Sequence, residues 1–177
     1  MKNYFFCGIK HSGKTTHAKI YANTIDIPVY DADDLILEMI NGYTIREYYR
    51  EFGKQAFLSK EYSAINKFLT GNTDDKVLSL GGGVCDNDDT MKLLKNNGII
   101  IFIRVDEETL YKRIVIDDIP PFLEGSPRKK FHDLFINREE KYLKYSDIVI
   151  EVQDAPISET AQIIRAEIGK WKKNGTQ

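Results

Sequence analysis

Residues 8–15 read Gly-Ile-Lys-His-Ser-Gly-Lys-Thr, and they lie between an apolar run at residues 4–8 and a stretch with helical spacing. This segment matches the pattern G-x-x-x-x-G-K-[ST] in the strand-to-helix context that the pattern requires. In such a loop, backbone N–H groups and the helix N-terminus face an anionic phosphate. Lys14 is then expected to reach the β- and γ-phosphates, and the Thr15 hydroxyl to bind Mg²⁺. The sequence therefore predicts a binding site for a nucleoside triphosphate.

The predicted nucleotide site uses mostly the main chain, since the x positions of this pattern contribute backbone amides rather than side chains. We therefore expect His11 to be a loop residue and not a catalytic base. His17 and His132, each in an expected helix, are expected to be surface residues and not ligands. The three histidines have no metal-binding spacing. The residues expected to hold the nucleotide phosphates are His11, Ser12, Gly13, Lys14, Thr15 and Thr16.

Five short β-rich runs each precede a stretch with helical spacing. The runs are nearly continuous in apolar residues, as strands covered on both faces of a parallel sheet must be. We therefore predict a three-layer α/β fold whose helices cross between parallel strands. The expected strands are residues 4–8, 27–30, 77–80, 99–105 and 148–152, and the expected helices are residues 14–23, 33–41, 44–69, 88–96, 107–117, 128–144 and 157–172.

The length of 177 residues predicts a single domain, and the 42% apolar content is enough for a core. A formal net charge of −2 argues against a nucleic-acid binder, which would be basic. The apolar runs are too short to span a bilayer, and residues 1–9 lack a secretory cleavage signature. Cys7 and Cys85 are expected to be buried and reduced. We expect a cytoplasmic monomer that binds small molecules, without a membrane or nucleic-acid partner.

Two segments stand out in composition. Residues 117–130 contain three prolines and one glycine between two helical stretches, and they are either a plain surface loop or a mobile lid. Residues 172–177 form a polar tail that is expected to fray.

Acidic residues and glycines follow the second and third expected strands. Asp31, Asp33 and Asp34 come after residues 27–30, and Gly81–Gly82–Gly83 follows residues 77–80. In an open α/β sheet, ligands bind outside the carboxyl ends of the strands, so both segments are expected in one crevice with the phosphate loop. One carboxylate can hold Mg²⁺ through water while another accepts a proton from an attacking hydroxyl. The alternative is that these acids only cap a helix N-terminus.

Taken together, these features resemble the shikimate kinase family, and the resemblance covers nearly the whole chain. It implies a five-stranded parallel sheet in the order 2-3-1-4-5, related to nucleoside monophosphate kinases, and a mobile lid. The matching features are the loop at residues 8–15 closed by Thr16, the D-x-D pair Asp31 and Asp33, the segment 44–61, the run Leu-Ser-Leu-Gly-Gly-Gly at residues 78–83, and Arg138 four residues before Tyr142.

The resemblance also implies a role for each matching residue. Lys14 and Thr15 would serve ATP and Mg²⁺, and Asp31 would hold the metal through water. Asp33 would bind the substrate hydroxyls and act as the base, so that Asp33 and Lys14 are the expected catalytic residues. The remaining roles are Gly81, Gly82 and Gly83 in the substrate pocket, Arg138 on the substrate carboxylate, Arg113 near the adenine, and residues 153–156 in the adenine loop.

The chain departs from the family pattern at four places. The family's Phe-Arg pair is Phe57-Leu58 here, so one of two arginines that clamp the carboxylate is missing. Pro120 stands where a lid arginine is expected, and His11 replaces a glycine of the phosphate loop. Lys54 stands where the family has glutamate. Lys54 is a candidate to replace the clamp arginine and to hold the acceptor's carboxylate together with Arg138. One of the cations at residues 128–130 is a candidate to replace the lid arginine at the γ-phosphoryl group, unless these residues are only a solvated basic helix start.

The function that the resemblance implies is an ATP-dependent phosphotransferase acting on the 3-hydroxyl of shikimate, in aromatic amino acid biosynthesis. Leu58 and Pro120 keep two alternatives open. One is a related kinase for another hydroxy acid or polyol, such as gluconate. The other is a nucleotide-binding regulatory module without catalysis.

Overall fold

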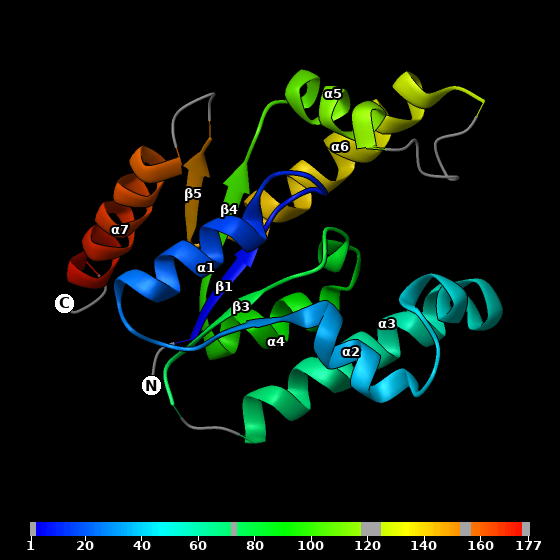
Figure 1. The fold of residues 1–177 in the computed structure, drawn as a ribbon, viewed down its shortest axis with the longest axis horizontal. Coiled ribbons are helices and arrows are strands. Elements are labelled where there is room, and N and C mark those ends of the chain that lie inside the picture. The colour runs from blue at the N-terminus through cyan, green and yellow to red at the C-terminus, as the bar shows by residue number, and fades with distance from the viewer. Residues whose placement is uncertain (1–2, 72–73, 118–124, 153–156, 175–177) are drawn as a thin grey trace.

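The computed structural model describes residues 3–71, 74–117, 125–152 and 157–174, and Figure 1 shows its ribbon. The strands are β1 (Asn3–Cys7), β2 (Val29–Asp31), β3 (Lys76–Ser79), β4 (Gly98–Arg104) and β5 (Ile148–Glu151). The helices are α1 (Lys14–Thr24), α2 (Ala32–Ile40), α3 (Ile45–Gly71), α4 (Asp88–Asn97), α5 (Glu107–Asp117), α6 (Pro127–Tyr145) and α7 (Ile157–Asn174), with a short 3₁₀ helix η1 (Val84–Asp86).

All four strand pairings are parallel, and the strand order is β2-β3-β1-β4-β5. The predicted α/β class and the sheet order implied by the resemblance are therefore confirmed. Because β3 lies between β2 and β1, the three segments that carry the sequence motifs leave the sheet at neighbouring positions. The register pairs Asp31 with Ser79 and Phe6 with Ser79, which aligns the ends of the three strands.

Helices cover both faces of the sheet, so the strand residues are buried on both sides. Tyr4 and Phe6 point to the face covered by α1 and α7, whereas Phe5 and Cys7 point to the opposite face. That second face packs against α3, α4, α5 and α6 through residues such as Ile65, Met91, Leu110, Phe131 and Tyr145. Alternate strand residues therefore fill two separate apolar layers, as a sheet covered on both faces requires.

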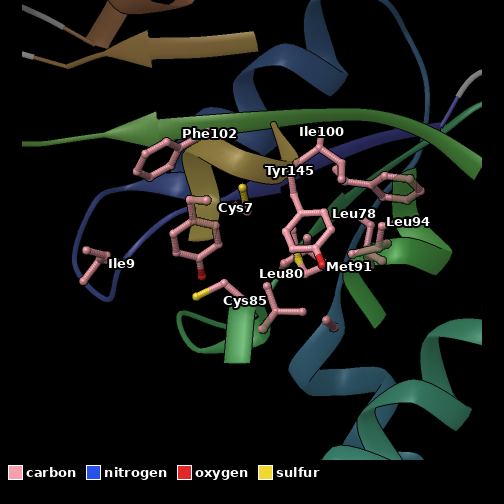
Figure 2. Packing of buried hydrophobic residues seen from close by; sticks show 14 of the residues in the cluster. Cys7, Ile9, Leu78, Leu80, Cys85, Met91, Leu94, Ile100, Phe102 and Tyr145 are labelled. Carbon is pink, nitrogen blue, oxygen red and sulfur yellow. The ribbon is translucent and has the colours of Figure 1, made fainter. Parts of the chain in front are cut away.

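Figure 2 shows Cys7 and Cys85 within the larger of these apolar layers, which also contains Phe102. Both cysteines are buried free thiols, as predicted. Burial is the largest cause that raises the pKa of the Cys85 thiol to about 11, and it also raises the pKa of Cys7. Both are therefore protonated at neutral pH and pack as small apolar groups.

Helices α2 and α3 form a pair beside β2, with a small apolar cluster of Ile36, Ile40 and Ala64. Thr44 and Glu47 have the Thr-x-x-Glu spacing of a capping box and make one, because each side chain accepts a hydrogen bond from the other's backbone N–H. The expected single helix at residues 44–69 is bent, since Gly53 has φ 80° and ψ 176°, outside helical values. Glycine adopts this conformation without the steric cost of a Cβ, and the bend was not predicted.

Other boundaries differ from the expectations by a few residues. Strand β2 begins and ends later than predicted and includes Asp31, and α7 continues to Asn174, so residues 172–174 are helical and not frayed. Of the expected lid, residues 118–124 lie outside the described residues, and residues 127–130 already belong to α6. No helix in the described part of the chain is long and apolar enough to span a bilayer.

Candidate active site

The phosphate loop connects β1 to α1 as predicted. Gly13, with φ 81°, precedes the first residue of α1 and has no side-chain cap, which leaves the helix N-terminus open to a ligand. His11 has φ 67°, in the left-handed region that glycine favours. The residue that replaces a family glycine therefore keeps the glycine-like backbone, and histidine is among the residues that tolerate it better than most.

Two side chains from outside this loop contact it. Arg113, on α5, donates a hydrogen bond from Nη1 to the backbone oxygen of His11 at 3.0 Å. The resemblance implies that Arg113 lies near the adenine, and this stays a prediction. The contact that the structure shows is with the phosphate loop. His17 is buried next to Gly13, so its expected surface position is wrong. Its side chain packs under the loop because α1 turns that face inward.

Lys14 and two neighbouring carboxylates influence one another. Burial lowers the pKa of Lys14, while the negative charges of Asp33 and Asp31 act in the opposite direction. The Asp33 side chain remains open to solvent on one side. Partial burial and the negative charge of Asp31 raise the pKa of Asp33, and Lys14 counteracts them. The sheet thus brings together three charged groups that are separated in the sequence.

Asp31 is both a helix cap and a neighbour of Thr15. Its Oδ1 accepts a hydrogen bond from the Asp33 backbone N–H at 3.0 Å, which caps α2. Its Oδ2 accepts a longer hydrogen bond of 3.4 Å from the Thr15 hydroxyl. Asp31 can therefore cap the helix and also hold a metal ion, because its two carboxylate oxygens have separate partners.

The oxygens around Thr15 are of the type that Mg²⁺ prefers. Thr15 Oγ1 lies 2.8 Å from the Ser79 hydroxyl and 3.4 Å from Asp31 Oδ2, which gives three hard oxygen donors in one place. No group of three or more His, Cys, Asp or Glu that could hold a metal occurs within the described residues. The donor set still fits Mg²⁺, which uses few protein ligands and retains several waters. Sequence analysis missed Ser79, whose register opposite Asp31 places it here.

The triple glycine allows close approach to neighbouring groups. A Cβ on Gly82 would lie 2.9 Å from the backbone nitrogen of Lys10, and a Cβ on Gly83 would lie 2.9 Å from Nη2 of Arg138. A Cβ on Gly81 would lie 3.4 Å from Oδ1 of Asp33. The prediction that this segment faces the phosphate loop and the acidic residues therefore agrees with the geometry.

Arg138, on α6, is fixed by one hydrogen bond to the triple glycine and by another to Asp86. Its Nη1 donates to the backbone oxygen of Gly82 at 3.0 Å, and its Nη2 donates to Asp86 Oδ2 at 2.9 Å. The Lys141 ammonium donates to the other oxygen of Asp86, also at 3.0 Å. Asp86 and Lys141 were not identified from the sequence, because neither belongs to a motif and their contact spans 55 positions.

Glu61, on α3, is a buried carboxylate close to Gly81 and Asn87. Its Oε2 accepts a hydrogen bond from Asn87 Nδ2 at 3.0 Å, and a Cβ on Gly81 would lie 3.9 Å from its Oε1. Burial is the main cause that raises the pKa of Glu61 to about 7, and the negative charges of Asp33 and Asp86 add to it. Asn87 also donates to the backbone oxygen of Leu58, at 2.9 Å, and so ties α3 to the segment after η1.

Leu58, which stands where the family pattern has an arginine, has an apolar side chain that cannot form an ion pair with a carboxylate. It lines a cavity of about 750 Å³ between α3 and α4, together with residues that include Gln55, Tyr62, Asp86 and Asn87. Lys54 is exposed and does not line this cavity. Its proposed contact with the substrate carboxylate is untested and stays a prediction.

The expected lid cations belong to the first turn of α6. Pro120 and the adenine loop at residues 153–156 lie outside the described residues. Arg128 forms ion pairs of 3.1 Å with both Glu107 and Glu108 and lies over the ring of Tyr111 at 4.8 Å. These contacts join the start of α6 to α5, so the Arg128 guanidinium is paired with carboxylates of α5.

Comparison with known proteins identifies the family. The family model described as "Shikimate kinase" matches residues 10–168 of this chain. The chain belongs to the shikimate kinase family. The curated shikimate kinase of Caldanaerobacter subterraneus subsp. tengcongensis is 32% identical over 170 residues, covering 95% of this chain and 97% of that protein. The shikimate kinase of Caldicellulosiruptor bescii is 30% identical over 174 residues, covering 98% of this chain and 99% of that protein.

Solved structures of shikimate kinases have the same fold. The structure from Acinetobacter baumannii, solved in complex with shikimate, has a TM-score of 0.85 and 25% sequence identity, and the match covers 100% of this chain and 96% of that one. The structure from Bacteroides thetaiotaomicron has a TM-score of 0.79 at 23% identity, covering 95% of this chain and 98% of that one. The family assignment that the motifs implied is therefore confirmed.

Proposed function

We propose that this chain transfers the γ-phosphoryl group of ATP to the 3-hydroxyl of shikimate, a step of aromatic amino acid biosynthesis. Family membership and full-length similarity to shikimate kinases support an alcohol phosphotransferase. The observation that carries the proposal is the convergence of Lys14, Asp33 and Arg138 at neighbouring strand ends. Lys14 adjoins the carboxylates, and Gly81–Gly82–Gly83 joins Asp33 to Arg138.

In the proposed reaction, Asp33 orients the acceptor hydroxyl and takes its proton as the new O–P bond forms. The bond between the γ-phosphorus and the β,γ-bridging oxygen breaks, and ADP leaves. Lys14 and the backbone amides of residues 11–16 neutralise and position the phosphates, which is most of the work in phosphoryl transfer. Arg138 and Gly81–Gly82–Gly83 would hold the acceptor, and Arg113 would stay near the adenine side of the loop.

The residues around Thr15 would hold Mg²⁺ with Asp31 acting through water. When bound, the ion would supply positive charge to the phosphate oxygens. Thr15 contributes a hydroxyl oxygen, and Ser79 fixes that hydroxyl at 2.8 Å. Asp31 remains available through Oδ2, because its Oδ1 is occupied by the cap of α2.

We further propose a cytoplasmic monomer whose partners are ATP and a small acceptor, without nucleic acid or membrane. The net charge of −2 and the two buried free thiols support this setting.

Leu58 supports a second candidate, a kinase for another hydroxy acid or polyol. An apolar side chain cannot replace an arginine on a carboxylate, and loss of one charge-assisted hydrogen bond costs about 1.5–3 kcal/mol. A non-catalytic nucleotide-binding module is the third candidate, although it has no need to combine Lys14 and Asp33.

The test is a coupled assay of ADP release with shikimate, quinate and gluconate as acceptors, with Lys14→Ala as the inactive control. The proposal requires the highest kcat/KM with shikimate. Preferential turnover of gluconate or quinate would favour the second candidate. ATP binding without turnover of any acceptor would favour the regulatory module.

A further inference from the structure

The acceptor-carboxylate site contains an internal carboxylate that the sequence did not reveal. Asp86 accepts a hydrogen bond of 2.9 Å from Nη2 of Arg138, and the two side chains are only 18% and 19% exposed. A close pair of opposite charges has little net charge when seen by a third group. Asp86 therefore reduces the attraction that Arg138 alone exerts on an incoming carboxylate.

Lys141 restores the positive charge that Asp86 cancels. It lies three residues after Arg138 on α6, and its ammonium donates to Oδ1 of Asp86 at 3.0 Å while Arg138 uses Oδ2. Burial by itself would raise the pKa of Asp86, but the charges of Arg138 and Lys141 hold that pKa below its ordinary value. Asp86 is therefore an anion at neutral pH, and the three side chains together carry one net positive charge.

We infer that Asp86 and Lys141 are positioning residues for the acceptor's carboxylate, with Lys141 replacing the charge that the family's arginine supplies at the position of Leu58. This inference rests on the proposed function and adds to it the origin of carboxylate specificity. Asp86 fixes the guanidinium of Arg138 against Gly82, and Lys141 keeps the Arg138 site electropositive. The second cation thus comes from α6, whereas the family pattern places it on α3.

The competing interpretation is that Lys141 forms only a structural ion pair at the edge of η1. Such a pair would have little effect on stability, since partly exposed ion pairs contribute little to folding. It would not change the affinity for a charged acceptor relative to an uncharged one. The two interpretations therefore differ in KM for shikimate and not in folding.

The experiment compares steady-state kinetics of the full-length wild type, Lys141→Met, Lys141→Arg and the double variant Asp86→Asn with Lys141→Met. Lys144→Met is the matched control, because Lys144 is on the same helix and interacts with the ring of Tyr145. Each protein is assayed with shikimate and with its methyl ester, which lacks the negative charge. Thermal unfolding of every variant verifies that it is folded.

We expect Lys141→Met to raise KM for shikimate roughly tenfold, with kcat and KM for ATP within about twofold of wild type. KM for the methyl ester should not change, and Lys141→Arg should retain the wild-type KM. The double variant should recover most of the lost affinity, because the introduced asparagine can still accept a hydrogen bond from Arg138 without opposing its charge.

The inference is overturned if Lys141→Met leaves KM for shikimate unchanged, if it raises KM for the ester equally, or if the double variant binds shikimate more weakly than Lys141→Met. A wild-type protein that does not phosphorylate shikimate would overturn the proposed function, and with it this inference. An active wild type with an unaffected Lys141→Met protein would overturn the inference alone.

Discussion

Asp33 combines two properties that a general base requires. It lies beside Gly81 and close to Lys14 of the phosphate loop, and its pKa is raised by partial burial and by Asp31, which strengthens it as a proton acceptor. The positive charge of Lys14 acts in the opposite direction and favours the ionised form of Asp33. The carboxylate next to it, Asp31, has a backbone N–H and the Thr15 hydroxyl as partners and is suited to hold an ion instead.

Asp33→Asn should lower kcat by about 10²–10⁴-fold, since asparagine keeps the shape of the side chain but cannot accept the proton. The Kd for ATP should remain within about threefold of wild type, as measured by titration calorimetry. If Kd for ATP weakens as much as kcat falls, Asp33 belongs to the metal site and the roles of Asp31 and Asp33 are exchanged.

Glu61 should make the stability depend on pH. Its pKa of about 7 in the folded protein exceeds the ordinary value of 4.5, so protonation favours the folded state. The corresponding stabilisation is fully present below pH 4.5 and is lost as the pH rises to about 7. The loss is at most about 3 kcal/mol, given 1.36 kcal/mol per unit of pKa.

Urea unfolding of wild type and Glu61→Gln between pH 4 and pH 8 measures this contribution. The difference in unfolding free energy between the two proteins should change across pH 4.5–7 in favour of Glu61→Gln. Glutamine retains an acceptor for Asn87 and has no charge to bury. A difference that is constant across this range would contradict the raised pKa.

The loop after β3 contacts both the phosphate loop and Arg138 through adjacent glycines. Gly82 packs on the backbone of Lys10 in the phosphate loop, whereas Gly83 packs on the guanidinium of Arg138. Backbone cannot move aside as easily as a side chain. Substitutions at these neighbouring positions should therefore have different kinetic effects.

Gly83→Ala should raise KM for shikimate by about tenfold and leave KM for ATP nearly unchanged, since its Cβ displaces only Arg138. Gly82→Ala should impair both KM values, because its Cβ would lie 2.9 Å from the Lys10 nitrogen and shift the phosphate loop. Steady-state kinetics with each substrate varied in turn distinguishes them. Identical effects of the two variants would contradict this division.

Helix α3 depends on its cap at the N-terminal end, because the bend at Gly53 leaves residues 45–52 as a short helical segment. Thr44→Ala should lower the free energy of unfolding by about 1 kcal/mol through loss of the capping box. Thr70→Ala, which removes a hydroxyl on the same helix away from the cap, is the control. Urea denaturation measures both, and equal effects would show that the cap contributes nothing.

Two helical pairs flank the loops that carry the candidate site. In Figure 1, the α2–α3 pair and the α5–α6 pair lie on opposite sides of the loops that follow β1 and β3. The acidic residues of α2 and the cations of α6 therefore reach the triple glycine from different parts of the chain. Ligands that bind between these parts should stabilise the whole fold.

ATP at 100 times its Kd should raise the free energy of unfolding by about 2.7 kcal/mol, because it binds the folded state alone. Lys14→Ala should fold normally, since Lys14 serves the loop and not the apolar core, but the same ATP concentration should not stabilise it. Thermal unfolding with and without Mg-ATP tests both statements. Equal stabilisation of the variant would show that Lys14 is dispensable for nucleotide binding.

Four features can be recognised in the amino-acid sequence without the structure: the α/β class, the phosphate loop, the capping box and the family. These features are local, because each is a short pattern whose chemistry depends on its immediate neighbours in the chain. Buried strand residues and the loop glycine at position 13 could be recognised without knowing what they contact. The sheet order followed only from the resemblance.

The contacts around Arg138 and around Thr15 became visible only in the folded chain. Asp86 lies 52 positions from Arg138, and Ser79 lies 64 positions from Thr15, so no local pattern connects them. Their contacts exist because parallel pairing aligns the ends of β2, β3 and β1 and because α6 packs against η1. The raised pKa of Glu61 likewise depends on burial between α3 and Asn87, since the charge of a carboxylate is set by its surroundings and not by its sequence neighbours.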